Sequence, residues 1–211
     1  SGTYSLDLSP IAGTNASSRN LGTSATSGTI WFRFYFRVTT MPSVDETEIA
    51  RVASSTGVRT YDVYIDTTGG EFVCIKNRVP GTPTTACGAT DIVTATWYRV
   101  EVRHLLSDTV GELQMRLYAG ESTTVLDDVS VSVGDTLATN VQQFFLGNVL
   151  ASTYDLNYDD IAINDSAGTF QNSWPGPGKI FRVTATSDDT VTWTKTGANC
   201  SATTNADCVD D

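Results

Sequence analysis

The sequence predicts an all-β fold, a two-sheet antiparallel jelly-roll sandwich. Short segments of alternating apolar and polar residues recur along the chain, and clusters of Gly, Pro, Ser and Thr separate them. No stretch of ten or more residues shows helical periodicity. The composition favours strands and turns, and a length of 211 residues suits one sizeable sandwich domain.

Twelve segments carry the strand pattern. The clearest are "GTIWFRFYFRV" at 28–38 and "WYRVEVRHL" at 97–105, in which apolar and polar residues alternate. The sequences "TGG" before Glu71 and "DTVGE" before Leu113 predict hairpin turns. In chain order, the predicted strands are 3–8, 28–38, 48–54, 59–66, 71–77, 97–105, 111–118, 126–133, 142–147, 157–164, 179–185 and 190–195.

The alternation assigns one face of three strands to the core and the other face to Arg and aromatic residues. Five of the ten arginines of the chain fall on this second face. Such a face is suited to stacking sugar rings and binding hydroxyls. It is equally suited to pairing acidic neighbours or docking another subunit. The candidate ligand-binding residues are Trp31, Arg33, Tyr35, Arg37, Trp97, Arg99, Arg103, Arg116 and Tyr118.

The charge and hydropathy of the chain argue against two classes of partner, nucleic acids and the membrane interior. Asp and Glu number 24 against 13 Lys and Arg, which gives a formal charge of −11. Nucleic-acid backbones are bound by basic surfaces, so we expect no nucleic-acid partner. No apolar run approaches membrane-spanning length, and we expect no membrane insertion.

The four cysteines form two local pairs, and their spacings match neither redox nor zinc motifs. We expect disulfides between Cys74 and Cys87 and between Cys200 and Cys208, with free buried thiols as the alternative. Disulfides indicate an oxidising, extracellular setting. The segment after Lys195 has almost no large apolar residue. We therefore predict a sandwich domain over 1–195 and a disulfide-stapled tail or linker start over 196–211.

The order of several motifs resembles that of a known family. "YSLDL", "GTIWFRFYFRV", "EIARV" and "WYRVEVR" are followed by "YDDIAINDSAGTFQNSWPGPGKI". This series resembles the concanavalin A-like, laminin-G-type jelly-roll modules of tailed-phage virion proteins and related bacterial surface proteins. Segment 158–180 is the most specific part, and the resemblance covers residues 3–195. It implies a glycan-binding, adhesion, or capsid- or tail-decoration module, with glycoside hydrolases and polysaccharide lyases in the wider superfamily.

The catalytic patterns of that superfamily are not found in the sequence. Sandwich glycosidases place ExDxxE on one strand, whereas "DETE" at 45–48 puts Asp45 opposite Glu46 and Glu48 and reads as loop. Asp159 and Asp160 are adjacent and should point to opposite faces of their strand. Lyases of the fold generally need a His-Tyr pair. His104, the only histidine, lies on the core-facing side of its strand and reads as structural.

A structural calcium ion is the one cofactor that the resemblance suggests. Carbohydrate-binding sandwiches often hold calcium with an Asp from a late "DD-apolar" strand and groups near the first strand. Asp159 and Asp160 match that position, and Asp7 is a partner if the first strand lies alongside. The alternative is that one Asp caps a turn and the other faces solvent. In either case Ile161 and Ile163 should seat the strand in the core.

These observations lead to one functional prediction and two alternatives. We predict a non-enzymatic virion or surface module, for capsid or tail decoration or adhesion, that recognises glycans. The first alternative is a free-standing carbohydrate-binding lectin with structural calcium, and the second is a polysaccharide-degrading enzyme. No cofactor is required for the main prediction. Its partners would be other virion or surface proteins in an oligomeric or lattice-attached state, at the virion surface or outside the cell.

Overall fold

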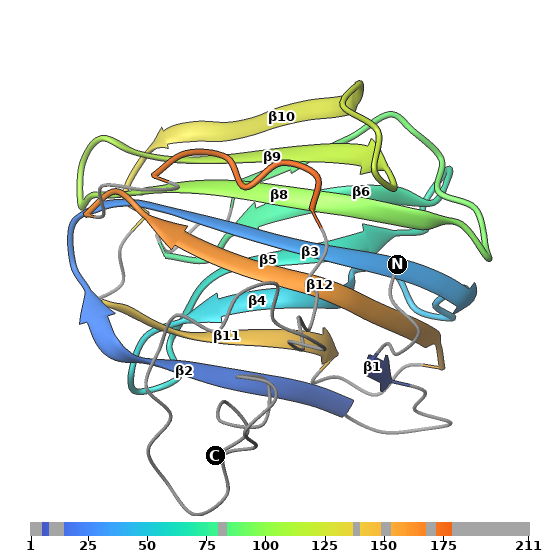
Figure 1. Ribbon diagram of the computed structural model, residues 1–211, viewed down its shortest axis with the longest axis horizontal. Coiled ribbons are helices and arrows are strands. Elements are labelled where there is room, and N and C mark those ends of the chain that lie inside the picture. The colour runs from blue at the N-terminus through green and yellow to red at the C-terminus, as the bar shows by residue number, and fades with distance from the viewer. Residues whose placement is uncertain are drawn as a thin grey trace, which may run out of the picture. The chain divides into compact units, whose positions relative to one another are not determined.

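The computed structural model describes residues 6–8, 15–79, 84–136, 140–148, 153–167 and 172–178. These residues form two antiparallel sheets of six strands each and contain no helix, which confirms the predicted sandwich (Figure 1). The strands are β1 (Leu6–Leu8), β2 (Asn15–Ala25), β3 (Gly28–Thr40), β4 (Thr47–Ala53), β5 (Arg59–Asp66), β6 (Phe72–Asn77), β7 (Thr84–Cys87), β8 (Trp97–Leu106), β9 (Gly111–Ala119), β10 (Val125–Gly134), β11 (Val141–Asn148) and β12 (Asp155–Asp165).

The strands are distributed between the sheets in a crossing order. The sheet that we call sheet A has the order β1-β12-β3-β8-β9-β10, and sheet B has the order β2-β11-β4-β5-β6-β7. Strands far apart in sequence are therefore neighbours, such as β12 beside β3 and β11 beside β4. This arrangement leaves each sheet with one face toward the core and one outer face.

Aromatic residues fill the space between the two sheets. Phe32, Phe34 and Phe36 lie on the inner face of β3 and are at most 1% exposed. Phe32 meets Phe144 of sheet B with ring centroids 4.9 Å apart. Burying each such side chain stabilises the fold by about 1.5–3 kcal/mol. The alternation in β3 thus creates both the core and the outer face of sheet A.

Ten of the predicted strands correspond to observed ones, and two observed strands were not predicted. Strand β2 is mostly polar, "NASSRNLGTSA", and it lies at an edge of sheet B. Strand β7 has only four residues and lies at the opposite edge. Edge strands need fewer apolar residues than central ones, so their sequences carry a weak signal. The predicted strands 179–185 and 190–195 lie outside the described residues.

The disulfide between Cys74 and Cys87 is confirmed. It joins directly paired residues of β6 and β7, with an S–S distance of 2.06 Å. Cys200, Cys208 and the predicted tail 196–211 lie outside the described residues, so that pairing and the domain boundary stay predictions. Within the described part of the chain, no helix has the length and apolar character needed to cross a membrane.

The Asp-Asp pair of β12 lies at a β-bulge rather than in a regular strand. Asp159 pairs with Tyr35 and Ala162 with Arg33, so β12 carries one extra residue at this point. Asp160 has a φ of 47°, which interrupts the alternation. Ile163 packs against the core as predicted. The prediction for Ile161 is wrong, because this residue falls in the bulge and is 38% exposed.

Candidate functional site

The predicted Arg-aromatic residues do come together on the outer face of sheet A. The register of β3, β8 and β9 pairs Trp31 with Arg103, Arg37 with Trp97, and Tyr35 with Arg99. Arg99 is in turn opposite Tyr118, and Arg116 is opposite Glu101. Arg33 lies between these pairs on β3. The strand alternation therefore assigned all nine residues to one face.

Most of the charge on this face is paired within the sheet. Arg99 forms an ion pair with Glu101 at 2.9 Å, and both side chains are 1% exposed. Arg99 also donates to the carbonyl oxygens of Gly120 and Ser122, and its guanidinium lies 4.0 Å from the ring centre of Tyr118. Two further ion pairs of this face, Arg103–Glu112 at 2.7 Å and Arg116–Asp128 at 3.0 Å, are more exposed. Ligand binding by the face as a whole stays a prediction.

The candidate calcium residues are near one another in the fold. Strand β1 lies beside β12 and pairs Asp7 with Asn157, as the calcium prediction required. Asp159 accepts a hydrogen bond from the backbone N–H of Asp160 at 2.9 Å, the turn-capping role given as the alternative. The other half of that alternative is wrong, because Asp160 is 6% exposed and does not face solvent. The side chain of Asp7 lies outside the described part of the structure, so the calcium site stays a prediction.

A different cluster of ionisable groups lies on the outer face of sheet B. Tyr61, Val63 and Ile65 of β5 face the core, which turns Asp62 and Tyr64 outward. Glu48 of β4 pairs directly with Tyr64, so Asp62, two residues away, is its diagonal neighbour. A bulge at Ile49 lets the core accept Ile49 and Ala50 while Glu48 stays on the outer face.

Both carboxylates of this cluster are buried beneath arginines. Glu48 is 2% and Asp62 is 1% exposed. Asp62 Oδ2 accepts a hydrogen bond from Arg59 Nη1 at 3.2 Å and another from Arg78 Nε. The other end of the Arg59 guanidinium, Nη2, lies 3.3 Å from Glu48 Oε2. Arg51 Nε lies 3.8 Å from the second oxygen of Glu48.

Burial and a neighbouring negative charge change the ionisation of Glu48. Burial raises the pKa of its carboxyl group to about 7, and the charge of Asp62 acts in the same direction. Arg51, Arg59 and Arg78 oppose this rise without cancelling it. Burial also raises the pKa of the Tyr64 phenol. Near neutral pH, Glu48 therefore exchanges a proton while Tyr64 keeps its own.

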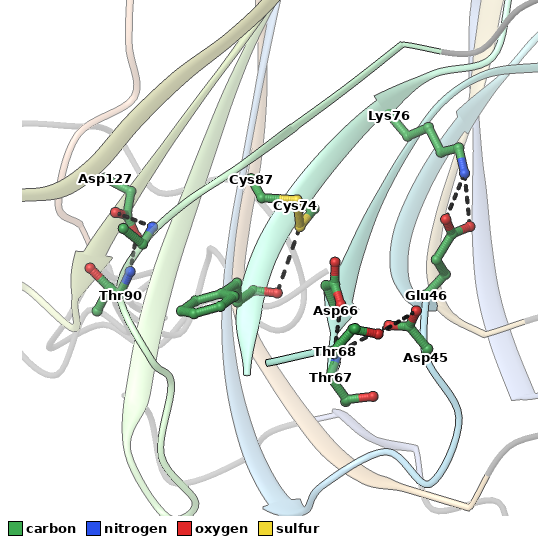
Figure 2. The surroundings of a disulfide bond; sticks show 12 residues. Asp45, Glu46, Asp66, Thr67, Thr68, Cys74, Lys76, Cys87, Thr90 and Asp127 are labelled. Atoms are coloured by element: carbon green, nitrogen blue, oxygen red, sulfur yellow. Dashed lines mark hydrogen bonds and ion pairs between the residues drawn. A yellow bond between two sulfur atoms is a disulfide. The ribbon is translucent and has the colours of Figure 1, made fainter. Parts of the chain in front are cut away.

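A cavity of about 250 Å³ opens above these groups. Its lining contains Glu48, Asp62, Tyr64, Arg59 and Arg78, with Asp45 and Glu46 at the entrance to β4. Figure 2 shows the surroundings of the disulfide, where Lys76 Nζ contacts both carboxylate oxygens of the lining residue Glu46 at 2.8 Å. Asp45 accepts hydrogen bonds from Thr67 and Thr68 in the turn after β5. Charged contacts thus fix this wall of the cavity.

This arrangement supplies the groups needed for general acid-base chemistry. A carboxyl group with a pKa near 7 is an efficient proton acceptor or donor at neutral pH. A protonated phenol beside it can donate, and guanidinium groups can stabilise a carboxylate or a developing negative charge. Paired groups with separated pKa values in a cavity are typical of functional sites.

The sequence interpretation missed this cluster. It read "DETE" at 45–48 as loop, although the predicted strand 48–54 already included Glu48 of β4, and it gave no role to Asp62. The available signal was the pair of outward-facing patterns Glu48-x-x-Arg51 and Asp62-x-Tyr64 on consecutive strands. His104, by contrast, is buried as predicted, with Nε2 2.8 Å from the carbonyl oxygen of Thr136.

Comparisons with known proteins identify the fold. No protein-family model and no curated protein sequence matches the chain. A polysaccharide lyase of family 18 is similar, with a TM-score of 0.52 and 10% identity over 78% of this chain and 88% of that chain. Domains LG4-5 of the mouse laminin alpha1 chain give a TM-score of 0.51 and 11% identity, over 75% and 41% of the two chains. An alginate lyase gives a TM-score of 0.49 and 14% identity. The match covers 70% of this chain and 66% of that chain.

The chain therefore has a concanavalin A-like jelly-roll fold. The prediction of a non-enzymatic module is contradicted, because a polysaccharide lyase has the same fold. The error has a physical origin. The prediction looked for an ExDxxE strand and for a His-Tyr pair, and it did not consider Glu48, Asp62 and Tyr64, which the pairing of two strands brings together.

Proposed function

We propose that this domain is a polysaccharide-degrading enzyme whose active site is the cavity on the outer face of sheet B. The observation that carries the proposal is the adjacent burial of Glu48 and Asp62 beneath a cavity that Tyr64 and two arginines also line. The polysaccharide lyase with the same fold supports the substrate class.

The groups present favour β-elimination at a uronic acid residue. In this reaction a base removes the proton on the carbon next to the uronate carboxylate. The released electron pair forms a carbon–carbon double bond, the adjacent carbon–oxygen glycosidic bond breaks, and the leaving oxygen takes a proton. Glu48 is the base and Tyr64 the acid in our proposal, since their raised pKa values leave one able to accept and the other able to donate.

Arg59 would bind the uronate carboxylate and neutralise the charge that forms on proton removal. Its side chain is 29% exposed and already bridges Glu48 and Asp62. A substrate carboxylate that takes over one end of this guanidinium would release Glu48 to act as the base. Asp62, held by Arg59 and Arg78, would keep the two guanidinium groups in place.

Cleavage of defined polymers tests the proposal. The wild-type protein is incubated with alginate, with C6-oxidised cellulose and with neutral soluble cellulose derivatives. Ultraviolet absorbance reports the new double bond, and a reducing-end assay reports every cleavage. We expect both signals with at least one acidic polymer and neither with the neutral one. The rate should rise as the pH increases through about 7, since Glu48 must be ionised to act as the base.

Two matched variants assign the activity to the cavity. Glu48→Gln should lower kcat by about 10²–10⁴-fold, the usual contribution of a general base. Glu112→Gln, in an exposed ion pair of sheet A, should leave it unchanged. Absence of cleavage with all acidic polymers would overturn the proposed function. Reducing ends without the double bond would overturn elimination in favour of hydrolysis.

We also propose that the domain works outside the cell or on a virion, joined to other surface proteins. The Cys74–Cys87 disulfide supports an oxidising compartment. The resemblance to tailed-phage virion proteins supports the virion setting. Sequencing the genomic neighbourhood tests this setting, and a neighbourhood of cytoplasmic metabolic genes without capsid, tail or export genes would contradict it.

A further inference from the structure

A second cavity, of about 400 Å³, lies on the outer face of sheet A. It is bounded by Arg33 of β3, by Asn164 of β12, and by Trp174, Pro175, Pro177 and Gly178 of the segment 172–178. Its volume falls in the range of about 300–1,000 Å³ typical of small-ligand sites. None of these residues belongs to the cavity on sheet B.

Arg33 places a buried cation at the wall of this cavity. The residue is 5% exposed, and Nε and Nη2 donate to the carbonyl oxygen of Asp160 at 3.1 and 3.0 Å. Nη1 donates to the carbonyl oxygen of Gly176 at 2.9 Å. These three bonds leave two of the five guanidinium N–H groups without a partner among the described residues.

The charge of Arg33 acts on the carboxylate of Glu101, but Arg33 forms no close ion pair within the described part of the chain. No ion pair of Arg33 is found there within 4.0 Å, and Glu101, opposite it on β8, gives its carboxylate to Arg99. A buried cation is costly unless an anion accompanies it. Arg33 therefore creates a preference for a negatively charged ligand.

Trp174 supplies a rigid aromatic surface in the same cavity. The guanidinium of Arg116 lies 4.2 Å from its ring centre and covers one face of the indole. The flanking residues Pro175 and Pro177 restrict the backbone around it. The cavity therefore combines a fixed aromatic ring with a guanidinium group and, in Asn164, a side-chain amide.

We infer that this cavity is a second binding site, for a carboxylated sugar residue of an acidic polysaccharide. The C–H face of the sugar ring packs on Trp174. The sugar carboxylate accepts hydrogen bonds from the two remaining N–H groups of Arg33, and the sugar hydroxyls form hydrogen bonds with the side-chain amide of Asn164. Aromatic rings and planar guanidinium groups are well suited to these two tasks. The site anchors the polymer on sheet A and performs no chemistry.

Binding of a matched pair of oligosaccharides tests this inference. Cellotetraose and its C6-oxidised counterpart differ only in the carboxylates. Each is titrated into the Glu48→Gln variant, so that cleavage cannot interfere, while calorimetry measures affinity and NMR follows the Trp174 indole N–H. We expect saturable binding of the oxidised oligomer with a shift of that signal, and binding at least about tenfold weaker for cellotetraose. Equal binding of the two oligomers, or none of the oxidised one, would overturn the inference.

Variants locate the binding at the cavity. Trp174→Ala should weaken binding of the oxidised oligomer by about tenfold, and Phe145→Ala, which removes an aromatic side chain of β11 outside both cavities, should not. Arg33→Lys keeps the charge but not the planar guanidinium. It should weaken binding of the acidic oligomer and leave binding of cellotetraose unchanged. Unchanged affinity in Trp174→Ala would refute the site. These readouts do not depend on turnover, so failure of the proposed activity and failure of this inference are distinguishable.

Discussion

The outer faces of the two sheets carry similar residues in different arrangements. On sheet A the central buried charges are of opposite sign, Arg99 and Glu101, and lie 2.9 Å apart. On sheet B two carboxylates, Glu48 and Asp62, are buried as diagonal neighbours and share Arg59. Burial raises the pKa of Glu101 against the opposing charge of Arg99. The pKa of Glu48 is raised by burial and by a like charge together.

This difference distinguishes the Arg99–Glu101 pair, which stabilises the fold, from the group formed by Glu48, Asp62 and Tyr64, which we call the reactive cluster. A buried pair of opposite charges holds the strands in register and has little chemistry to offer. On sheet B, burial and the negative charge of Asp62 raise the pKa of Glu48 to about 7, although Arg51, Arg59 and Arg78 oppose the rise. We therefore assign structural support to the centre of sheet A, and the proton transfer that we propose belongs to sheet B.

The largest expected effect comes from breaking the pair on sheet A. Arg99→Met leaves Glu101 buried without its cation and should lower the free energy of unfolding by about 3–5 kcal/mol. Urea unfolding measures the change. The double variant Arg99→Met with Glu101→Leu should recover most of the loss. A single variant as stable as the wild type would show that the pair does not support sheet A.

The pH dependence of the free energy of unfolding tests the burial of Glu48 on sheet B. The folded state raises the pKa of Glu48 from 4.5 to about 7, so it binds a proton more tightly than the unfolded chain. Stability from this group is full below pH 4.5 and is lost as the pH rises to about 7, by about 3 kcal/mol in all. Glu48→Gln should remove this slope in urea unfolding measured from about pH 4 to 8.

His104 provides an internal reference for that experiment. Burial lowers its pKa from 6.5 to about 4, so its contribution is lost as the pH falls through this range. The effect is opposite in sign to that of Glu48 and is the same in both proteins. Subtracting the two pH profiles therefore isolates Glu48, and a flat difference would contradict the assignment.

Removing the disulfide gives a smaller effect and shows how far the reactive cluster depends on the edge of sheet B. Cys74 lies between Tyr64 and Cys87 in the strand register. The double variant Cys74→Ala with Cys87→Ala should lower stability by about 2–3 kcal/mol in the loop-entropy model. We expect the pH slope of stability to persist, because Glu48 and Asp62 lie on β4 and β5. Loss of the slope would mean that the cluster needs the bridge.

The smallest effect should come from the exposed pair on sheet A. Arg103 and Glu112 are 27% and 29% exposed, so water and salt screen their attraction. A double-mutant cycle should give a coupling energy of about 0.2–1 kcal/mol that decreases in high salt. A coupling energy as large as the loss expected for Arg99→Met would mean that burial does not explain the difference in strength between the two ion pairs.

The sequence predicted the sandwich and most of its strands because the alternation in β3, β8 and β9 is a local property. It also brought nine residues to one face correctly, since alternation decides the face within each strand. The prediction failed where the position of a residue depends on a partner strand or on an irregularity such as a β-bulge. The polar edge strand β2, the bulge at Asp160 and the pairing of Glu48 with Tyr64 all depend on tertiary contacts.

The reactive cluster shows the same limit. Glu48 and Asp62 are separated by a turn and lie on different strands, so neither strand alone contains a catalytic pattern. Only the register of β4 and β5 makes them neighbours, and burial together with the charge of Asp62 raises the pKa of Glu48. A search for outward-facing acids on consecutive strands would have selected this pair together with many exposed ones.

The ionisation of Glu48 tests the contrast between the two faces most directly. Carbon-13 NMR of the side-chain carboxyl groups follows each glutamate as the pH changes, with Glu48→Gln to assign the signal. We predict an inflection for Glu48 near pH 7 that moves to lower pH in Asp62→Asn, where the like charge is removed. An inflection near 4.5 in the wild type would contradict the account, because Glu48 would then be an ordinary carboxylate.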